Sequence, residues 1–186
     1  MRLSTWDYGE NAAYFITICT ADRKHFFGEV VNGTMQLSVA GGLAAKYWKE
    51  IPVYFPFTTL DAFVVMPNHM HGILIIDKAD SSNDDNDDCG GAINRAATER
   101  GFGKKTKSGG ITGGKNPMLH ENLSRVMRWY KGRCTFEIRK VNSTFAWQSR
   151  FHDHIIRNHP SFQQIQQYIV DNPQRWEQDK FYSGLL

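Results

Sequence analysis

Two histidines, at positions 69 and 71, are the residues of this 186-residue chain whose type and spacing point most directly to chemistry. They follow Pro67-Asn68, between the apolar runs Ala62–Met66 and Ile73–Ile76. This pattern predicts a strand, a tight turn and a second strand, and side chains two positions apart share one face of a strand. His69 and His71 therefore present two imidazoles side by side, which is half of a divalent-metal site.

The C-terminal part of the chain carries groups that could complete such a site. Tyr168 and Asn172 are four residues apart in a segment with helical periodicity, so they share one helical face. Asn172 offers an oxygen ligand, and the Tyr168 phenol could attack a phosphodiester and conserve the bond energy as a phosphotyrosine. Gln164, on the same face, and Gln167, off that face, are rival ligands.

Ordinary structural roles explain each of these residues when it is taken alone. Paired histidines beside a turn are most often surface or hydrogen-bonded groups. Tyr168 borders an apolar stripe of its helix, and Asn172 precedes a proline, as residues at helix ends often do. Three further histidines, His152, His154 and His159, lie in a different strand and turn, where surface polarity is the simpler explanation. The chemical interpretation depends on the combination.

Hydrophobic periodicity predicts the elements that must position these groups. Strands are expected over Ala13–Thr20, Thr34–Val39, Thr59–Met66, His69–Asp77 and Phe145–Ile156, and helices over Ala40–Tyr54, Leu119–Val141 and from Asn158 or Ser161 to about Asp171. Helices segregated onto a mostly antiparallel sheet give an α+β sandwich, for which a ferredoxin-like arrangement is one natural solution.

The composition changes sharply over residues 78–117, which are rich in Gly, Ser, Asn and Asp and have almost no periodicity. We expect one domain, residues 1–186, interrupted there by a flexible Gly/Asp/Lys-rich insertion. The insertion is acidic first and basic afterwards. A nucleic-acid clamp, an autoinhibitory strip in which the Asp run mimics phosphate, and a neutral spacer are the roles open to it.

The net charge is only +3, but basic residues gather in the second half of the chain. A basic half fits a phosphate-backbone partner, although solvated surface charge explains it equally well. The residues expected to contact phosphate are Arg125, Arg128, Lys131 and Arg133 in the predicted helix and Lys104 and Lys105 in the insertion.

Three well-separated cysteines, Cys19, Cys89 and Cys134, form no CxxC pair, so neither a zinc knuckle nor a disulfide framework is indicated. A reducing cytoplasm is the expected compartment. No apolar run approaches the roughly 20 residues that span a bilayer, and we expect no membrane association.

Several segments together resemble one family. VVMPNHMHGILI, then Trp147-Gln148 followed by FHDHIIRN, and then YIVDNPQRW are similar to motifs of the REP-associated tyrosine transposases, a branch of the single-tyrosine HUH transposase superfamily. The N-terminal segment DYGENAAYFITICTADRKHFFGEVVNGTMQLS resembles the opening strands of the same family. The resemblance covers nearly the whole chain outside residues 78–117.

This resemblance implies a ferredoxin-like HUH fold and a metal-dependent single-strand DNA endonuclease and strand transferase. It implies that His69 and His71 bind Mg²⁺ or Mn²⁺ and that Tyr168 takes the 5′ phosphate. Asn172 stands where relatives place a polar third ligand, which is Gln in some of them. The implied partner is single-stranded or hairpin DNA at imperfect palindromes. The protein is then a nucleoid-associated monomer or homodimer.

Two other functions fit parts of this pattern. A hairpin-specific DNA-binding protein that no longer mobilises DNA is the main alternative, but it would be free to lose His69, His71 and Tyr168. A metal-dependent phosphohydrolase of the HIT type would want a third alternating histidine at position 73, where the chain has Ile73.

Overall fold

Four antiparallel strands, in the order β4-β5-β1-β6, form the main sheet of the computed structural model, which describes residues 8–78 and 121–182. β-branched and aromatic residues dominate these strands, as expected for pleated, largely buried segments. The strands are β1 (Ala12–Cys19), β4 (Thr58–Met66), β5 (His69–Ile76) and β6 (His152–Ile156). β5 and β1 are the central strands, so the predicted histidine strand is paired on both edges.

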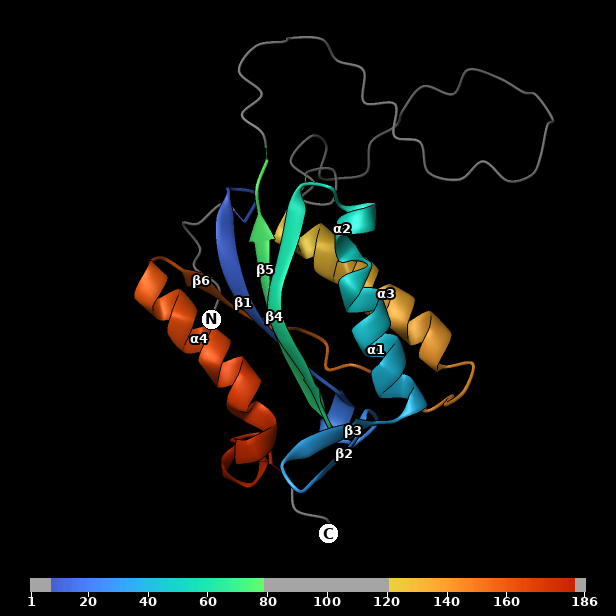
Figure 1. Cartoon of the computed structure of the whole chain (residues 1–186). Helices are drawn as coiled ribbons and strands as arrows, with labels where there is room; N and C mark the ends of the chain where they lie inside the picture. Colours follow the sequence, from blue (N-terminus) through green and yellow to red (C-terminus); the bar gives the residue numbers. More distant parts are fainter. Residues whose placement is uncertain (1–7, 79–120, 183–186) are drawn as a thin grey trace, which may run out of the picture.

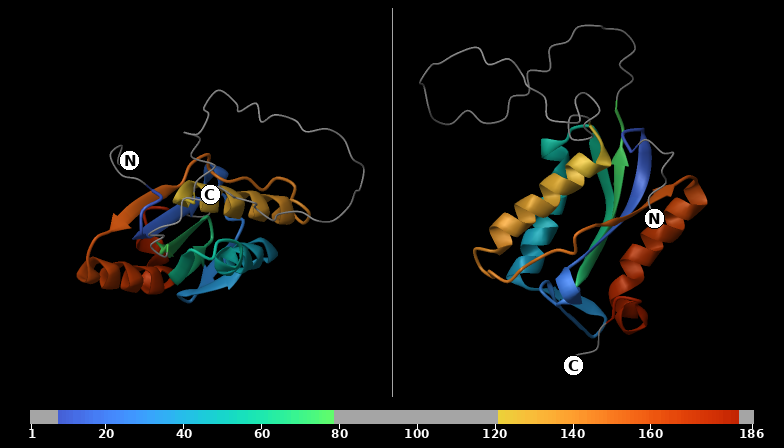
Figure 2. Two further views of the ribbon diagram at one scale, coloured as in Figure 1. Left: turned by 90° about the horizontal axis from the view of Figure 1, so that it is seen from above. Right: turned by 180° about the vertical axis from the view of Figure 1, so that it is seen from behind.

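Helices cover both faces of this sheet (Figures 1 and 2). Helix α1 (Val39–Lys49), the short α2 (Ile51–Tyr54) and α3 (Leu123–Ile138) lie on one face, and α4 (His159–Asp171) lies on the other. Without α4, the order β1-α1-β4-β5-α3-β6 and the sheet order are those of a ferredoxin-like domain. The predicted α+β fold class is confirmed, and α4 covers the face that such a domain leaves open.

The alternation of side chains along each strand divides the apolar residues between two cores. The larger core lies between the sheet and the helices α1 and α3, and its fully buried members include Trp48, Tyr14, Tyr130, Ile16, Met70 and Leu74. The smaller core lies under α4 and is built on Ile73, Ile156 and Ile169. His69 and His71 alternate with Met70, so they point to the α4 face.

A two-stranded hairpin, β2 (Gly28–Val31) with β3 (Thr34–Leu37), lies at the end of the sheet where β5 begins (Figure 1). Its turn is Asn32-Gly33, and both residues have positive φ, as such turns require. Beyond α4 the chain continues as a 3₁₀ segment, η3 (Asn172–Gln178), against which Gly33 packs.

Several boundaries differ from the sequence-based expectation. The helix predicted over Leu119–Val141 is observed over Leu123–Ile138. The helix predicted to continue to Tyr54 is divided: α1 ends at Lys49, and Ile51 begins a separate short helix, α2, with Pro52 in its first turn. The strand predicted from Phe145 starts only at His152; before it, Trp147 makes a single bridge to Thr20. Asn172 ends α4 as predicted, but the chain goes on in 3₁₀ turns. The prediction of a flexible insertion over residues 78–117 falls outside the described residues except at Lys78.

Asparagine side chains cap the N-termini of two helices. The side chains of Asn122 and Asn158 accept hydrogen bonds from the backbone N–H groups of Arg125 and Ser161, and so begin α3 and α4. Within residues 8–78 and 121–182, no helix combines the length and hydropathy that crossing a bilayer demands.

Gly72 allows the indole of Trp48 to pack directly against the histidine strand. A Cβ at position 72 would lie 2.5 Å from Cζ2 and 2.9 Å from Cε2 of Trp48, which is fully buried. The indole is rigid and has no solvent to move into, so any side chain at position 72 displaces either the ring or the strand that carries His71.

We therefore expect Gly72→Ala to lower the free energy of unfolding by about 1–3 kcal/mol, the usual cost of overpacking a core. Urea denaturation measures the change. The matched control is Gly132→Ala in α3, where a Cβ meets no atom within 4 Å, so the helix should gain about 0.5–1 kcal/mol. Equal effects at the two glycines would contradict the packing argument.

Candidate metal and tyrosine site

The histidine pair is positioned by the register of β5 with β1. His69 lies opposite Cys19 and His71 opposite Thr17, and both imidazoles are essentially inaccessible to solvent. The two rings have their centroids 4.6 Å apart. The structure thus places the two predicted ligands side by side on one face of a central strand.

Hydrogen bonds hold each imidazole by its Nδ1 atom. Asn68 Nδ2 donates to the carbonyl of Phe181, which turns Asn68 Oδ1 toward His69 Nδ1, 2.9 Å away. His69 Nδ1 therefore carries the proton, and its Nε2 keeps a free lone pair. His71 Nδ1 lies 2.8 Å from Thr17 Oγ1, so its Nε2 also points away from the sheet.

Burial keeps both imidazoles neutral. Desolvation, together with the nearby charges of Lys180 and Arg23, lowers the pKa of His69 to about 3. Desolvation is also the main cause that lowers the pKa of His71 well below its ordinary value, with His69 second. Neutral imidazole is the form that binds metal ions.

Tyr168 reaches this pair from α4. Its hydroxyl lies 3.3 Å from His71 Nε2 and 3.3 Å from Asp179 Oδ2, and its ring packs edge-on to Phe15. Desolvation, with the negative charge of Asp179 next, raises the pKa of Tyr168 to about 12. The side chain is nevertheless 38% exposed, so an external reactant can approach the hydroxyl.

Asn172 follows Tyr168 by one helical turn and lies beside it, as the spacing predicted. Its Nδ2 donates to Asp179 Oδ2 over 3.1 Å, while its Oδ1 is buried without a hydrogen-bond partner. Of the rival ligands, Gln167 donates to Asp171 instead, and both Gln164 and Gln167 are exposed. A cavity of about 470 Å³ is bordered by His71, Tyr168, Asn172 and Asp179.

Asp179 is the site residue that the sequence analysis missed. It follows η3, and its Oδ1 accepts a hydrogen bond from the Phe181 backbone N–H. The ligand atoms of His69, His71 and Asp179 all lie within 4.8 Å of one another. The segment after a short 3₁₀ turn has no periodicity from which the direction of a side chain could be predicted. The acidic residue type was therefore the one sequence feature that could have marked Asp179 as a site residue.

The buried polar atoms of this site suit a metal ion. His69 Nε2 and Asn172 Oδ1 have no hydrogen-bond partner, and such orphaned groups are costly unless something binds them. Two imidazoles and a carboxylate, with an amide oxygen beside them, form a mixed nitrogen and oxygen donor set for a divalent cation. Three or four protein ligands leave positions open for a substrate.

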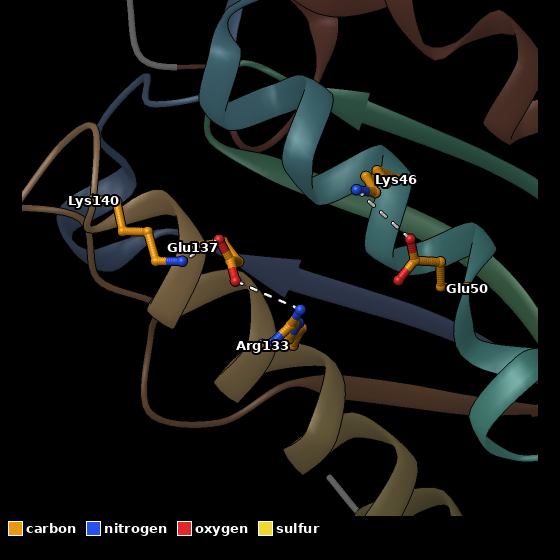
Figure 3. Close-up of polar contacts among 5 residues, drawn as sticks. All are labelled: Lys46, Glu50, Arg133, Glu137 and Lys140. Carbon is orange, nitrogen blue, oxygen red and sulfur yellow. Dashed lines mark hydrogen bonds and ion pairs between the residues drawn. The ribbon is translucent and has the colours of Figure 1, made fainter. Parts of the chain in front are cut away.

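The predicted phosphate-binding residues of α3 lie in the helix layer on the opposite face of the sheet from His69 and His71. Arg133 pairs with Glu137, which also binds Lys140 (Figure 3). The Arg133 guanidinium also lies over the ring of Tyr47. Lys131 Nζ donates to the carbonyls of Gln148 and Arg150.

Arg125 is half-buried and Arg128 is exposed on the same helix. Lys104 and Lys105 lie outside the described residues. Phosphate contact by any of the six basic residues stays a prediction.

Known proteins share the fold and the sequence of this chain to different degrees. No protein-family model matches the chain. The solved structure of a REP-associated tyrosine transposase bound to a REP hairpin superimposes with a TM-score of 0.58 at 18% identity, over 97% of this chain and 77% of that one. The fold is therefore the one that the sequence motifs indicated, and the resemblance is confirmed at the level of the fold.

Sequence identity to a relative shows the family to which this chain belongs. An uncharacterized protein of Haemophilus influenzae is 34% identical over 184 residues, which is 98% of this chain and 91% of that protein. This chain belongs to one family with that protein.

Acid should destabilise the metal-free protein. As the pH falls, histidines of the unfolded chain bind protons, whereas the buried histidines of the folded chain stay neutral. An unfolded histidine titrates near pH 6.5 and His69 near 3, so stability is full above about pH 6.5 and falls below it. Each such histidine contributes a slope of up to about 1.4 kcal/mol per pH unit. Urea denaturation between about pH 7 and pH 5 measures it.

The control is His154→Asn, which changes an exposed histidine on β6 and should keep the wild-type slope. His69→Asn should reduce the slope. A free energy of unfolding that does not change over this pH window would contradict the burial argument.

Proposed function

We propose that this chain is a metal-dependent single-strand DNA endonuclease and strand transferase that acts at hairpin-forming palindromic DNA through a covalent 5′-phosphotyrosine. One observation carries the proposal. A partly exposed tyrosine hydroxyl lies 3.3 Å from one of two buried, neutral imidazoles and 3.3 Å from a carboxylate, all within the same chain. A nucleophile, an acceptor for its proton and a group of metal ligands thus meet at one point.

Hairpin DNA is the proposed substrate. The solved structure that shares this fold is a REP-associated tyrosine transposase bound to a REP hairpin. Basic side chains lie around the tyrosine site of this chain: Lys180 and Arg175 border the cavity of Tyr168, and Arg23 donates to the Lys180 carbonyl. Positive groups at a cavity mouth attract and hold a phosphate backbone.

The proposed metal site consists of His69, His71 and Asp179, with Asn172 Oδ1 as a further oxygen ligand. Imidazole and carboxylate together suit Mn²⁺ better than Mg²⁺, which prefers oxygen ligands alone. When bound, such an ion would polarise the scissile phosphate and stabilise the charge on the leaving oxygen.

The residues of the chain account for the rest of the reaction. The Tyr168 phenol is neutral at rest because its pKa is about 12, so it needs a base as it attacks. Asp179 Oδ2 already accepts its hydrogen bond and takes the proton while the tyrosyl O–P bond forms. The bond between phosphorus and the 3′ oxygen then breaks, and the leaving 3′ oxygen takes a proton from water to become a 3′ hydroxyl. Attack by another 3′ hydroxyl on the phosphotyrosine reverses these steps and joins the strands.

Positioning residues keep this arrangement in place. Asn68 and Thr17 orient the two imidazoles, and Asn172 holds the Asp179 carboxylate toward the phenol. The Asp179 carboxylate accepts from Tyr168 and Asn172 through Oδ2 and from the Phe181 N–H through Oδ1. A carboxylate has about four acceptor positions, so one remains for a metal ion.

Covalent trapping tests the nucleophile. The probe is a pool of single-stranded oligonucleotides with a hairpin of randomised stem and randomised unpaired flanks, incubated with Mn²⁺. We expect a protein–DNA adduct that survives SDS, and we expect Tyr168→Phe to abolish the adduct while hairpin binding persists, because the ring remains and only the attacking oxygen is lost.

The matched control is Tyr182→Phe, which removes an exposed phenol outside the cavity. An adduct that persists in Tyr168→Phe would show that another residue is the nucleophile. Hairpin binding without any adduct in the wild-type protein would favour the alternative, a DNA-binding protein that no longer mobilises DNA.

Metal affinity tests the ligand set without any cleavage. We expect Asp179→Asn to weaken Mn²⁺ binding by at least about tenfold, since it removes the one charged oxygen donor from the group while keeping the side-chain shape. Titration of Mn²⁺ followed by electron paramagnetic resonance measures the affinity of the DNA-free protein.

Asp171→Asn is the control, because Asp171 is a nearby carboxylate that pairs with Arg175 instead. Equal Mn²⁺ affinity in the two variants would remove Asp179 from the ligand set.

A further inference from the structure

A β-bulge interrupts β4, the edge strand over which α4 chiefly lies. The pairing register of β4 with β5 shifts between Leu60 and Phe63. Asp61 and Ala62 therefore stand together opposite a single residue of β5, Ile73. Bulges are frequent beside active sites, where they redirect a side chain. The metal and tyrosine chemistry described so far does not use this bulge.

The bulge turns the Asp61 side chain toward α4. Asp61 Oδ1 accepts a hydrogen bond from the Ala62 N–H and another from Gln166 Nε2 of α4, each over 2.6 Å. The first bond satisfies a backbone donor where strand pairing is interrupted. The second joins the edge strand to the helix, and hydrogen bonds to a carboxylate are about twice as strong as those between neutral groups. We call this pair the Asp61–Gln166 clamp.

The apolar contacts of α4 are too few to fix the rotation of the helix about its own axis. Ile169 is the one residue of α4 that is fully buried, and Phe162 and Ile165 beside it are partly buried. Apolar contact has no preferred direction, so the helix can roll on this narrow stripe with little loss of buried area. A contact of defined geometry is needed to hold one rotation.

Gln166 and Tyr168 project from opposite flanks of the apolar stripe. Successive residues of an α-helix are about 100° apart around its axis, so two positions turn a side chain by about 200°. On one flank Gln166 binds β4, and on the other the Tyr168 hydroxyl lies 3.3 Å from His71 Nε2. Among the described residues, these are the two side-chain hydrogen bonds that join α4 to the sheet. A roll that opens the first also moves the Tyr168 hydroxyl.

We propose that Asp61 is a positioning residue of the tyrosine site, which acts through Gln166 to fix the rotation of α4. Tyr168 gives up its contact with His71 when it attacks, so the clamp is the bond that holds the helix during the reaction. The inference rests on the proposed function, because it gives the clamp the task of aligning the nucleophile. A displacement of about 1 Å caused far from the reacting atoms can reduce a rate about a hundredfold.

Exchange of the two groups of the clamp tests this inference. Gln166→Glu keeps the length of the side chain but sets a second carboxylate against Asp61, and at about pH 8 the two ionised groups repel. Adding Asp61→Asn supplies an amide that donates to the new carboxylate, while its oxygen still accepts from the Ala62 N–H. The matched control is Gln163→Glu, which places the same charge at an exposed position of the same helix.

Two measurements are made on the full chain. The first is the rate constant for the SDS-stable adduct with Mn²⁺ and a saturating hairpin recovered from the randomised pool. The second is the Tyr168 resonance in ¹H–¹³C spectra of protein with ring-labelled tyrosine, assigned by its loss in Tyr168→Phe. The chemical shift depends on the packing of this ring against His71 and Phe15, whose ring centroids are 5.3 and 6.1 Å away. It requires neither DNA nor cleavage.

We expect Gln166→Glu to lower the rate constant about a hundredfold, while the hairpin dissociation constant stays at the value of the control. The Tyr168 resonance should move toward that of an exposed tyrosine. The exchange variant should restore both the rate constant and the chemical shift, which a merely structural loss would not allow. If Gln166→Glu does not fold, Gln166→Met keeps the length, removes only the donor and should lower the rate constant about tenfold, the worth of one hydrogen bond to a charged group.

A wild-type rate constant and an unmoved resonance in Gln166→Glu, or in Gln166→Met if that variant is needed, would overturn the inference. A loss that the exchange variant leaves unrestored would do so too. A resonance that moves and returns, without any adduct in the wild-type protein, would support the positioning of Tyr168 and reject the proposed cleavage. Adduct formation at equal rates in Gln166→Glu and Gln163→Glu would retain the cleavage and reject the clamp.

Discussion

The pairing register of β1 with β5 is the constraint on which the candidate site depends. It sets Thr17 opposite His71 and Cys19 opposite His69, on the face that α4 covers. A slip of one residue would turn both imidazoles into the core under α1 and α3, where Met70 and Leu74 now lie. The register is secured because each strand buries apolar side chains on both faces, so any slip exposes or misplaces a large apolar area.

Burial then determines the chemistry of the histidines. Two imidazoles without solvent stay neutral, and their Nδ1 atoms bond to Asn68 and Thr17, so their Nε2 atoms face the same small volume as the Tyr168 hydroxyl. The unpaired His69 Nε2 and Asn172 Oδ1 destabilise the isolated domain. Groups that bind a cation are often left in this state, since the ion compensates their desolvation and links metal binding to folding.

The sequence predicted those parts of the site that follow from regular periodicity. Strand alternation put His69 and His71 on one face, and helical spacing put Tyr168 and Asn172 on another. Neither could show that the two faces meet, because that depends on which side of the sheet α4 packs. The motif resemblance supplied that link. Asp179 and the orientation of Asn68 were beyond prediction, since both depend on the path of the chain after η3, where no periodic pattern exists.

The two ends of the region between Lys78 and Glu121 are fixed at the opposite end of the sheet from the site. Lys78 exchanges hydrogen bonds with Asn11, and the N–H at the start of α3 donates to Tyr8. β5 has eight residues, so His69 lies about 25 Å from this junction. Sequence can therefore be lengthened, shortened or replaced at the junction without moving a ligand or the nucleophile. Evolution could append new recognition segments there, and an experimenter could graft a fluorescent domain at the same place.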